Sequence, residues 1–271
     1  MSNPTIPIWI DSPTNIQTNE QALELLKQKN DLEFWTDQGA VKVSNERWLE
    51  AQKFEKKGWM ETWAHAQSDR QPEHFELFSG YRTLPHNLGH VLEVGCGPFT
   101  QLFTILDAHT ANHVTLQDPL IFDYIKHPHC TYKLVKDNEW DDERHKLRGH
   151  WCSLVSGPVE KLDYWHEMFD TIVCINVLEH VRDAKLAMQN MYNMLKPDGI
   201  LVFGERDHDD YNPNRLYDVG HPIRLNSSVI LNFAEKFHVL YNNNRVPHHH
   251  YFIGQKWNAI QPKLSSSNTS E

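Results

Sequence analysis

The chain has 271 residues, of which 39% are hydrophobic and 23% are charged, and this composition predicts a folded globular protein rather than a disordered one. Its 36 acidic and 26 basic side chains give a formal net charge of -10 with the histidines neutral. A negative field repels phosphate groups, so the composition argues against general nucleic-acid binding and against anionic membranes as partners.

The four cysteines show no CxxC spacing, which predicts free thiols in a reducing compartment. The first residues lack the basic and apolar regions of a signal peptide. The longest apolar run, "TIVCINVL", is too short to span a bilayer. We therefore expect a cytoplasmic protein without a membrane-inserted segment.

The N-terminal part of the chain predicts an arm followed by helices. Residues 1–17 are rich in Pro, Asn and Thr and suit an extended arm, whereas leucine spacing predicts a helix over 19–30. A second helix is predicted over 45–67, with Asn45 as its N-cap and tryptophans on a broad apolar face. This layer could simply pack on a core, or its aromatic side chains could line an acceptor pocket.

From about residue 88, strand and helix patterns alternate, which is typical of a doubly wound α/β fold with helices on both faces of a mostly parallel, seven-stranded sheet. The pattern predicts an N-terminal arm and helical cap over 1–80, a main domain over 81–262 and a disordered tail over 263–271. The polar stretch 127–150 is expected to be a surface insertion or an irregular helix. The predicted strands are 90–95, 113–118, 151–157, 169–178, 200–205 and a terminal hairpin of 237–243 with 250–257.

A glycine turn, "VLEVGCGPFT", follows the first of these strands. Gly95 and Gly97 allow a close backbone approach to a ligand. Thr100 stands where the dinucleotide fingerprint G-x-G-x-x-G requires its third glycine, and no GK[ST] follows as a P-loop would need. A pyrophosphate ligand is therefore not favoured.

The segment Glu93-x-Gly95-Cys96-Gly97 resembles the first motif of class I S-adenosylmethionine-dependent methyltransferases. Three further segments are similar to that family in order and spacing, and together they cover about residues 88–205. They are Asp118 after the second strand, "FDTIVCINVLEHV" with Asn176 at the end of the fourth strand, and "LKPDGILVF" leading into the fifth strand.

The resemblance implies S-adenosyl-L-methionine as the cofactor and assigns residues to it. The glycine turn would pass beneath its methionine part, Glu93 would place negative charge near the ammonium group, and Cys96 would contribute only size. Asp118, followed by Pro119, would accept hydrogen bonds from the ribose hydroxyls. Asn176 would complete the site at the end of the fourth strand.

One part of the chain departs from the family pattern. Pro158 stands where a carboxylate often meets the adenine amino group, so we expect adenine to be held by the backbone N–H of Val159 and by apolar packing, with possible help from Glu160.

Candidate bases lie in the loop 205–225, which should leave from the carboxyl edge of the sheet, where ligands bind in open α/β folds. His221, in "GHPIRL", is the favoured general base and Asp209 the second candidate; the alternative is that His221 and Arg224 only hold the loop to the core. His208, Asp209 and Asp210 could form a cation site, but solvated or helix-capping roles are favoured for the two aspartates, and no metal is assigned.

Two other histidine groups are assigned no catalytic role. His180, in the "LEHV" segment, is expected to brace the turn after the fourth strand. The run His248–His250 lies on a predicted strand, where neighbouring side chains point to opposite faces, so all three cannot converge on one metal.

The sequence as a whole predicts a methyltransferase acting on a small-molecule acceptor, with a hydroxyl of a natural product, sugar or lipid-like metabolite as the first choice. A small amine is the alternative acceptor. A cofactor-binding partner subunit without catalysis is a further alternative, and the oligomeric state stays open.

Overall fold

The computed structural model describes residues 35–36, 39–66, 79–136, 143–209 and 218–258. The predicted arm, the helix over 19–30 and the tail lie outside these residues. Within the described part of the chain, no helix is long and apolar enough to cross a membrane. The four cysteines are all buried and form no disulfide.

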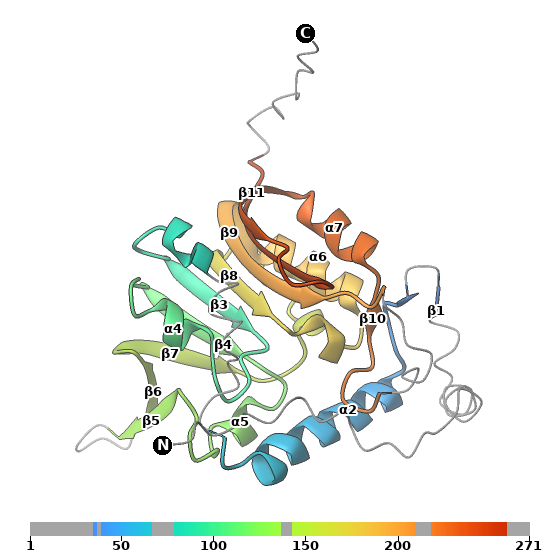
Figure 1. Cartoon of the computed structure of the whole chain (residues 1–271). Coiled ribbons are helices and arrows are strands. Elements are labelled where there is room, and N and C mark those ends of the chain that lie inside the picture. The colour runs from blue at the N-terminus through green and yellow to red at the C-terminus, as the bar shows by residue number, and fades with distance from the viewer. Residues whose placement is uncertain (1–34, 37–38, 67–78, 137–142, 210–217, 259–271) are drawn as a thin grey trace, which may run out of the picture.

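A mixed sheet forms the centre of the described structure (Figure 1). Its middle five strands are parallel, and antiparallel strands flank them on both sides. In spatial order the described strands are β11 (Phe237–Asn243), β12 (His249–Lys256), β9 (Leu195–Arg206), β8 (Phe169–Ile175), β3 (His90–Val94), β4 (His113–Gln117), β7 (His150–Val155), β6 (Glu143–Leu147) and β5 (Lys133–Lys136).

The predicted doubly wound α/β fold is confirmed, and its seven strands correspond to β3, β4, β7, β8, β9, β11 and β12. The stretch 127–150 was wrongly expected to lack strands, because β5 and β6 extend the sheet as an antiparallel pair. β5 lies at the edge of the sheet with β6 beside it, and most of their described side chains are not buried. Their polar residues therefore show no strand pattern in the sequence. Tyr132 and Leu147 nevertheless anchor this pair in the core.

Each face of the sheet is covered by helices because successive strand residues point to opposite sides. Leu92 and Ile172 join the core beneath α6 (Ala184–Met194) and α7 (Ser227–Ala234). Val91 and Val173 join the opposite core, beneath α4 (Leu102–Ile105) and α5 (Ile121–Tyr124). Burial on both faces explains why these strands read as continuous apolar runs.

The N-terminal helix differs from its prediction at both ends. The α-helix α2 spans Asn45–Lys57 and then becomes the π-helical segment η2 (Gly58–Thr62). Ser44, rather than Asn45, is its N-cap, and the Ser44 hydroxyl accepts a hydrogen bond from the N–H of Arg47 at 3.1 Å. A small second sheet places β2 (Gly39–Ala40) between β1 (Trp35–Thr36) and β10 (Arg224–Leu225), which ties the start of the described chain to a late segment.

The strand order creates a switch point beside β3. The chain runs outward from β3 to β4 and β7, then returns to β8 and β9 on the other side of β3. Figure 1 shows α2 lying beyond the carboxyl ends of the central strands. In open α/β sheets, ligands bind outside the carboxyl ends of the strands at such a switch point.

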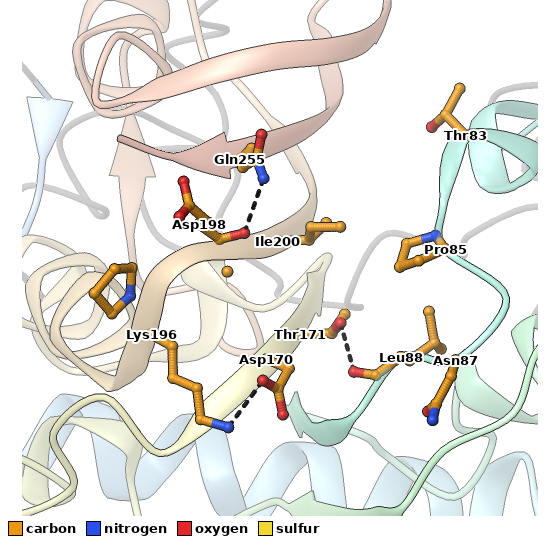
Figure 2. Close-up of a pocket in the computed structure, with 12 residues that line it drawn as sticks. Thr83, Pro85, Asn87, Leu88, Asp170, Thr171, Lys196, Asp198, Ile200 and Gln255 are labelled. Carbon is orange, nitrogen blue, oxygen red and sulfur yellow. Dashed lines mark hydrogen bonds and ion pairs between the residues drawn. The ribbon is translucent and has the colours of Figure 1, made fainter. Parts of the chain in front are cut away.

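A surface hollow lies at the opposite, amino-terminal edge of the sheet (Figure 2). Lys196 and Asp170 form an ion pair at 2.8 Å on its wall, and Thr171 donates a hydrogen bond to the carbonyl of Leu88. These contacts join the starts of three strands, so we assign this hollow to the packing of the fold rather than to ligand binding.

Candidate functional site

The glycine turn after β3 has the left-handed backbone that its two glycines permit. Gly95 has φ 64° and Gly97 has φ 53°. A Cβ atom added to Gly95 would lie 2.6 Å from a methyl group of Val177, whereas one added to Gly97 would meet nothing within 4 Å. Gly95 therefore serves packing against the turn after β8, and Gly97 leaves open space in front of the backbone.

Three side chains hold this turn in place. Gln117 accepts a hydrogen bond from the N–H of Gly95 at 3.3 Å, and Asp118 accepts one from the N–H of Gly97 at 3.1 Å. The Tyr132 hydroxyl donates to the carbonyl of Gly97 at 2.9 Å. The motifs in the sequence did not identify Gln117 and Tyr132. A glutamine inside the apolar strand "HVTLQD" does indicate a buried side chain that needs hydrogen-bond partners.

Gln117 also joins two loops at the carboxyl edge of the sheet. Its side-chain amide donates to the carbonyl of Gly157 at 2.5 Å, in the loop after β7. The glycine turn and the loop expected to meet adenine are thereby held at a fixed separation by one side chain.

Asp118 lies at the end of β4 and is nearly buried. Its carboxylate accepts hydrogen bonds from the N–H groups of Leu120 at 2.7 Å and Gly97 at 3.1 Å. Burial raises the pKa of Asp118 to about 6, although these two hydrogen bonds oppose the shift. The adjacent Pro119 carbonyl accepts a hydrogen bond from the Ser156 hydroxyl at 3.2 Å.

Glu93, expected to place negative charge near the ammonium group of the cofactor, also makes contacts within the protein. Its buried carboxylate accepts hydrogen bonds from the Thr100 hydroxyl and from the N–H groups of Gln101 and Leu102, the latter two at 2.8 and 3.2 Å. These are the first backbone donors of α4, which the short helix cannot satisfy itself. Glu93 thus holds the start of α4 below the glycine turn.

Cys96 is also buried, and its sulfur lies 3.9 Å from the Tyr132 hydroxyl. Burial, together with the negative charges of Asp118 and Glu93, raises the pKa of Cys96 well above its ordinary value. The thiol therefore stays protonated and inert, in keeping with a role limited to size.

The expected adenine loop forms the 3₁₀ turn η4 (Val159–Lys161), with Pro158 as its N-cap. The Val159 side chain is buried, and its carbonyl accepts a hydrogen bond from the Asn190 amide at 3.1 Å. Glu160 accepts hydrogen bonds from the N–H groups of Arg182 and Asp183 at 2.7 and 3.0 Å. The Glu160 oxygen that makes these bonds is thereby committed to the start of α6.

Asn176, at the end of β8, has a left-handed backbone with φ 58° and donates its N–H to the carbonyl of Gly204 at 2.8 Å. This turn aims the next residue, Val177, at Gly95. The N–H groups of Val177 and Leu178 both donate to the carboxylate of Glu205, at 3.1 and 2.6 Å. Burial and the neighbouring Glu179 raise the pKa of Glu205 to about 8.

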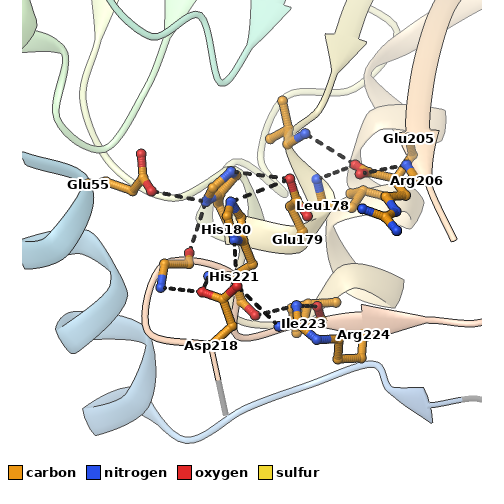
Figure 3. Close-up of polar contacts among 12 residues, drawn as sticks. Glu55, Leu178, Glu179, His180, Glu205, Arg206, Asp218, His221, Ile223 and Arg224 are labelled. Atoms are coloured by element: carbon orange, nitrogen blue, oxygen red, sulfur yellow. Dashed lines mark hydrogen bonds and ion pairs between the residues drawn. The ribbon is translucent and has the colours of Figure 1, made fainter. Parts of the chain in front are cut away.

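A polar group that we call the Glu179 cluster lies where α2, the turn η5 (Leu178–His180) and the segment 218–224 meet (Figure 3). Its members are Glu55, Glu179, His180, Asp218, His221 and Arg224. The imidazole rings of His180 and His221 lie 4.8 Å apart, centre to centre. Glu179 Oε1 lies 3.6 Å from His180 Nε2 and 3.7 Å from His221 Nε2.

The charges within the Glu179 cluster are strongly coupled. Burial alone would lower the pKa of His221, but Glu179 and Asp218 outweigh it and raise that pKa to about 9. Burial would raise the pKa of Glu179, but His221 and His180 outweigh it and lower that pKa to about 2. His221 and Glu179 thus each favour the charged form of the other.

Of the other acidic and histidine candidates of the loop, Asp209 contacts the start of α7, whereas His208 lies close enough to the Glu179 cluster for their charges to interact. Asp209 is exposed, and its carboxylate accepts a hydrogen bond from the N–H of Ser227 at 3.1 Å, at the start of α7. Burial and the charge of Arg224 lower the pKa of His208 to about 4. Asp210 lies outside the described residues.

The histidine run is divided between two environments. His248 Nδ1 and His250 Nε2 lie 2.9 and 2.7 Å from the two oxygens of Asp207, whereas His249 Nδ1 lies 3.0 Å from the carbonyl of Pro247. His248 and His250 thus share one buried carboxylate, and His249 contacts a different group.

Helix α2 is fastened across the carboxyl edge of the sheet at both ends. Arg47 is buried and donates hydrogen bonds to the carbonyls of Asp218 and Val219. Lys56 forms an ion pair with Asp123 of α5 at 2.9 Å. The Trp59 ring lies 5.7 Å from the Phe99 ring beside the glycine turn. The glycine turn, Asp118 and the Glu179 cluster thus lie beneath one helix.

A family model described as a methyltransferase domain matches residues 64–260. No curated protein matches the chain. Several solved structures share the fold at low sequence identity, and the three that follow each match 70–82% of this chain.

Phosphoethanolamine N-methyltransferase 1 of Haemonchus contortus, solved with phosphoethanolamine and S-adenosylhomocysteine, is 15% identical, with a TM-score of 0.52 over 82% of this chain and 51% of that one. A putative methyltransferase of Haloferax volcanii, solved in complex with the Trm112 activator, is 10% identical, with a TM-score of 0.52 over 80% of this chain and 100% of that one. The PH0226 protein of Pyrococcus horikoshii OT3 is 14% identical, with a TM-score of 0.50 over 70% of this chain and 92% of that one.

Proposed function

The chain belongs to the methyltransferase family whose domain model it matches, with S-adenosylmethionine as its cofactor, and we propose that it methylates a hydroxyl group of a small molecule. The observation that carries this proposal is the placement of the Glu179 cluster beneath the same helix as the glycine turn and Asp118. A hydroxyl is a weak nucleophile until its proton is removed or its pKa is lowered, whereas a neutral amine needs only orientation. A buried group of carboxylates and imidazoles is suited to removing the proton of a hydroxyl.

The residues at the switch point fit the cofactor. Gly97 leaves open space where a Cβ atom would otherwise stand, and we propose that the methionine part of the cofactor lies there. The Asp118 carboxylate would accept hydrogen bonds from the ribose hydroxyls, with Pro119 beside it. The Val159 N–H, preceded by Pro158, would meet adenine, and Asn176 would border the site from β8. Glu93 and Cys96 would support the turn from below.

When bound, S-adenosylmethionine supplies an electrophilic methyl group on a sulfonium. The task left to this chain is to orient an acceptor toward that methyl group and to accept the proton of the acceptor's hydroxyl. We assign this task to the Glu179 cluster as a whole. Asp209 is left out because it contacts the start of α7 from an exposed position.

The net charge of -10 supports a small-molecule acceptor over a nucleic acid. The Haemonchus neighbour carries the name of an amine methyltransferase, and methylation of a small amine is therefore the competing outcome of the test.

The test uses S-adenosylmethionine labelled with ¹³C in its methyl group, a protein-free extract of small metabolites and the purified protein. Carbon NMR distinguishes methyl groups attached to oxygen from those attached to nitrogen. We expect a new methyl ether signal that is absent when the protein is left out and weaker with the Asp118→Ala variant. A new N-methyl signal in its place would overturn the hydroxyl proposal while leaving the enzyme class intact.

A further inference from the structure

We propose that Glu55, His180 and His221 form a binding site for one divalent transition-metal ion. Each of these residues offers a ligand atom that lies within 4.8 Å of the ligand atoms of the other two. Glu55 reaches the same point from α2, with its Oε1 3.8 Å from the His180 ring at Nδ1. Ligands that bind one zinc ion at about 2.0–2.2 Å lie roughly 3.3–3.5 Å from one another, so small side-chain rotations would close the site.

Both imidazoles are oriented in the way that metal-binding histidines require. His221 Nδ1 lies 3.1 Å from Asp218 Oδ2, and His180 Nδ1 lies 3.1 Å from the carbonyl oxygen of Gly220, so Nε2 of each ring is the atom that would bind an ion. A ligating histidine almost always uses its second nitrogen to contact a carboxylate or a carbonyl, which fixes the ring and raises its basicity. The Asp218 carboxylate and the Gly220 carbonyl would serve the two rings in this way.

The charge balance also favours a cation at this point. The Glu179 cluster brings together the carboxylates of Glu55, Glu179 and Asp218, and two arginines, Arg224 and the adjacent Arg47, lie against it. A bound dication would offset the remaining negative charge.

The donor set indicates the class of metal. Imidazole nitrogens with a carboxylate oxygen suit Zn²⁺, Co²⁺, Fe²⁺ or Mn²⁺, whereas Mg²⁺ and Ca²⁺ prefer oxygen ligands alone. Three protein ligands leave at least one coordination position for another group, as in catalytic zinc sites.

The position of the site gives the ion a specific use. Glu55 lies close enough to Asp118 for its charge to affect that carboxylate, so the site borders the proposed ribose position. A metal ion there could bind the acceptor oxygen and lower the pKa of its hydroxyl. This use depends on the proposed function, but metal binding itself does not.

The first experiment titrates the tag-free, metal-stripped full-length protein with Co²⁺ and follows its visible absorption. We expect one ion per chain, with a spectrum typical of nitrogen and oxygen ligands in a site of low coordination number. Competition with Zn²⁺ should abolish that spectrum, whereas the same concentration of Mg²⁺ should not. A featureless titration, or equal competition by Mg²⁺, would overturn the proposal.

Variants then locate the ion. Glu55→Gln, His180→Ala and His221→Ala should each weaken Co²⁺ binding at least a hundredfold, and Asp218→Asn should weaken it roughly 10–100-fold as an orienting partner. The exposed His166→Ala is the matched control and should bind as the parent does. Glu55→Gln keeps both histidines and nearly the same volume, so it tests the site even if a histidine variant fails to fold.

A second histidine group could compete for the ion and needs its own control. His248 and His250 share Asp207, so the double variant His248→Ala/His250→Ala is titrated in parallel. We expect unchanged Co²⁺ binding in that variant. Loss of binding there, with binding retained in Glu55→Gln, would overturn the proposal. Because the readout is metal binding, these results are independent of whether the acceptor is a hydroxyl.

Discussion

The carboxylate of Asp118 accepts a hydrogen bond from the backbone N–H of Gly97 at 3.1 Å, which fastens the end of β4 to the turn after β3. A second bond, from the N–H of Leu120, fixes the other oxygen of the same carboxylate. A carboxylate has further lone pairs beyond these two, so Asp118 can still accept hydrogen bonds from ribose hydroxyls. Its position is thus set by the backbone before any ligand arrives.

Replacing Asp118 by Ala should weaken binding of S-adenosylmethionine by about 1.5–3 kcal/mol, the scale of hydrogen bonds to a charged group. Isothermal titration calorimetry measures this directly. The exposed Asp163→Ala is a matched control and should leave the affinity unchanged. An unchanged affinity in Asp118→Ala would show that the ribose lies elsewhere.

Cofactor binding should also depend on pH through Asp118. Burial raises the pKa of this group to about 6, so below that pH it is mostly neutral and accepts hydrogen bonds less strongly. Calorimetry should show the affinity falling as the pH drops from 7 to 5, and Asp118→Asn should remove most of that dependence.

Because the folded pKa lies above the unfolded value of 3.8, the contribution of Asp118 to folding stability has the opposite trend. It is fully present below about 3.8 and is lost as the pH rises through about 6.

The two glycines of the turn should respond differently to substitution by alanine. Both have positive φ, which costs an alanine about 1–2 kcal/mol. In Gly95→Ala the new methyl group would also collide with Val177, so we expect a further loss of about 1–3 kcal/mol from overpacking. Gly97→Ala should fold with only the smaller loss but should bind S-adenosylmethionine at least about tenfold more weakly. Thermal unfolding and calorimetry separate the two effects, and equal cofactor affinity in Gly97→Ala and the parent would contradict our placement of the methionine part.

Glu160 offers a test of the adenine loop. Its carboxylate serves the N–H groups of Arg182 and Asp183, so Glu160→Ala should lower the free energy of unfolding by about 1–3 kcal/mol. Cofactor affinity should stay the same once the variant is folded. Glu235→Ala, at an exposed position, should change neither quantity. A folded Glu160→Ala protein with clearly weakened cofactor binding would instead give Glu160 a part in adenine recognition.

The histidine run predicts a contrast between neighbours. His250→Ala removes a 2.7 Å contact with buried Asp207 and should destabilise the fold by about 1.5–3 kcal/mol. His249→Ala removes a contact with the carbonyl of Pro247 and the stacking of its ring on Tyr251, and should cost about 0.5 kcal/mol. Urea unfolding of the two variants under the same conditions measures the difference, and similar losses would contradict the assignment.

Much of the fold could be predicted because its signals are local. Parallel strands buried on both faces read as apolar runs, and β3, β4 and β8 lie where these runs occur. The edge strand β5 and its neighbour β6 carry no such signal, because most of their described side chains are not buried. The end of α2 was placed too late because nothing in the spacing of its apolar residues marks the change to a π-helix at Gly58.

The sequence by itself determined the class of enzyme, because the glycine turn, Asp118 and the segments around β8 and β9 are read from residue types at fixed spacing. Only the tertiary structure decided which side chains work together. Glu93 and Glu160 turned out to hold helix starts, and His221 turned out to share a cluster with Glu55 and Glu179. The partners of Glu93 lie seven to nine residues away in the chain, whereas Glu55 and His221 are 166 residues apart, and the charge that His221 meets depends on how α2 lies across the sheet.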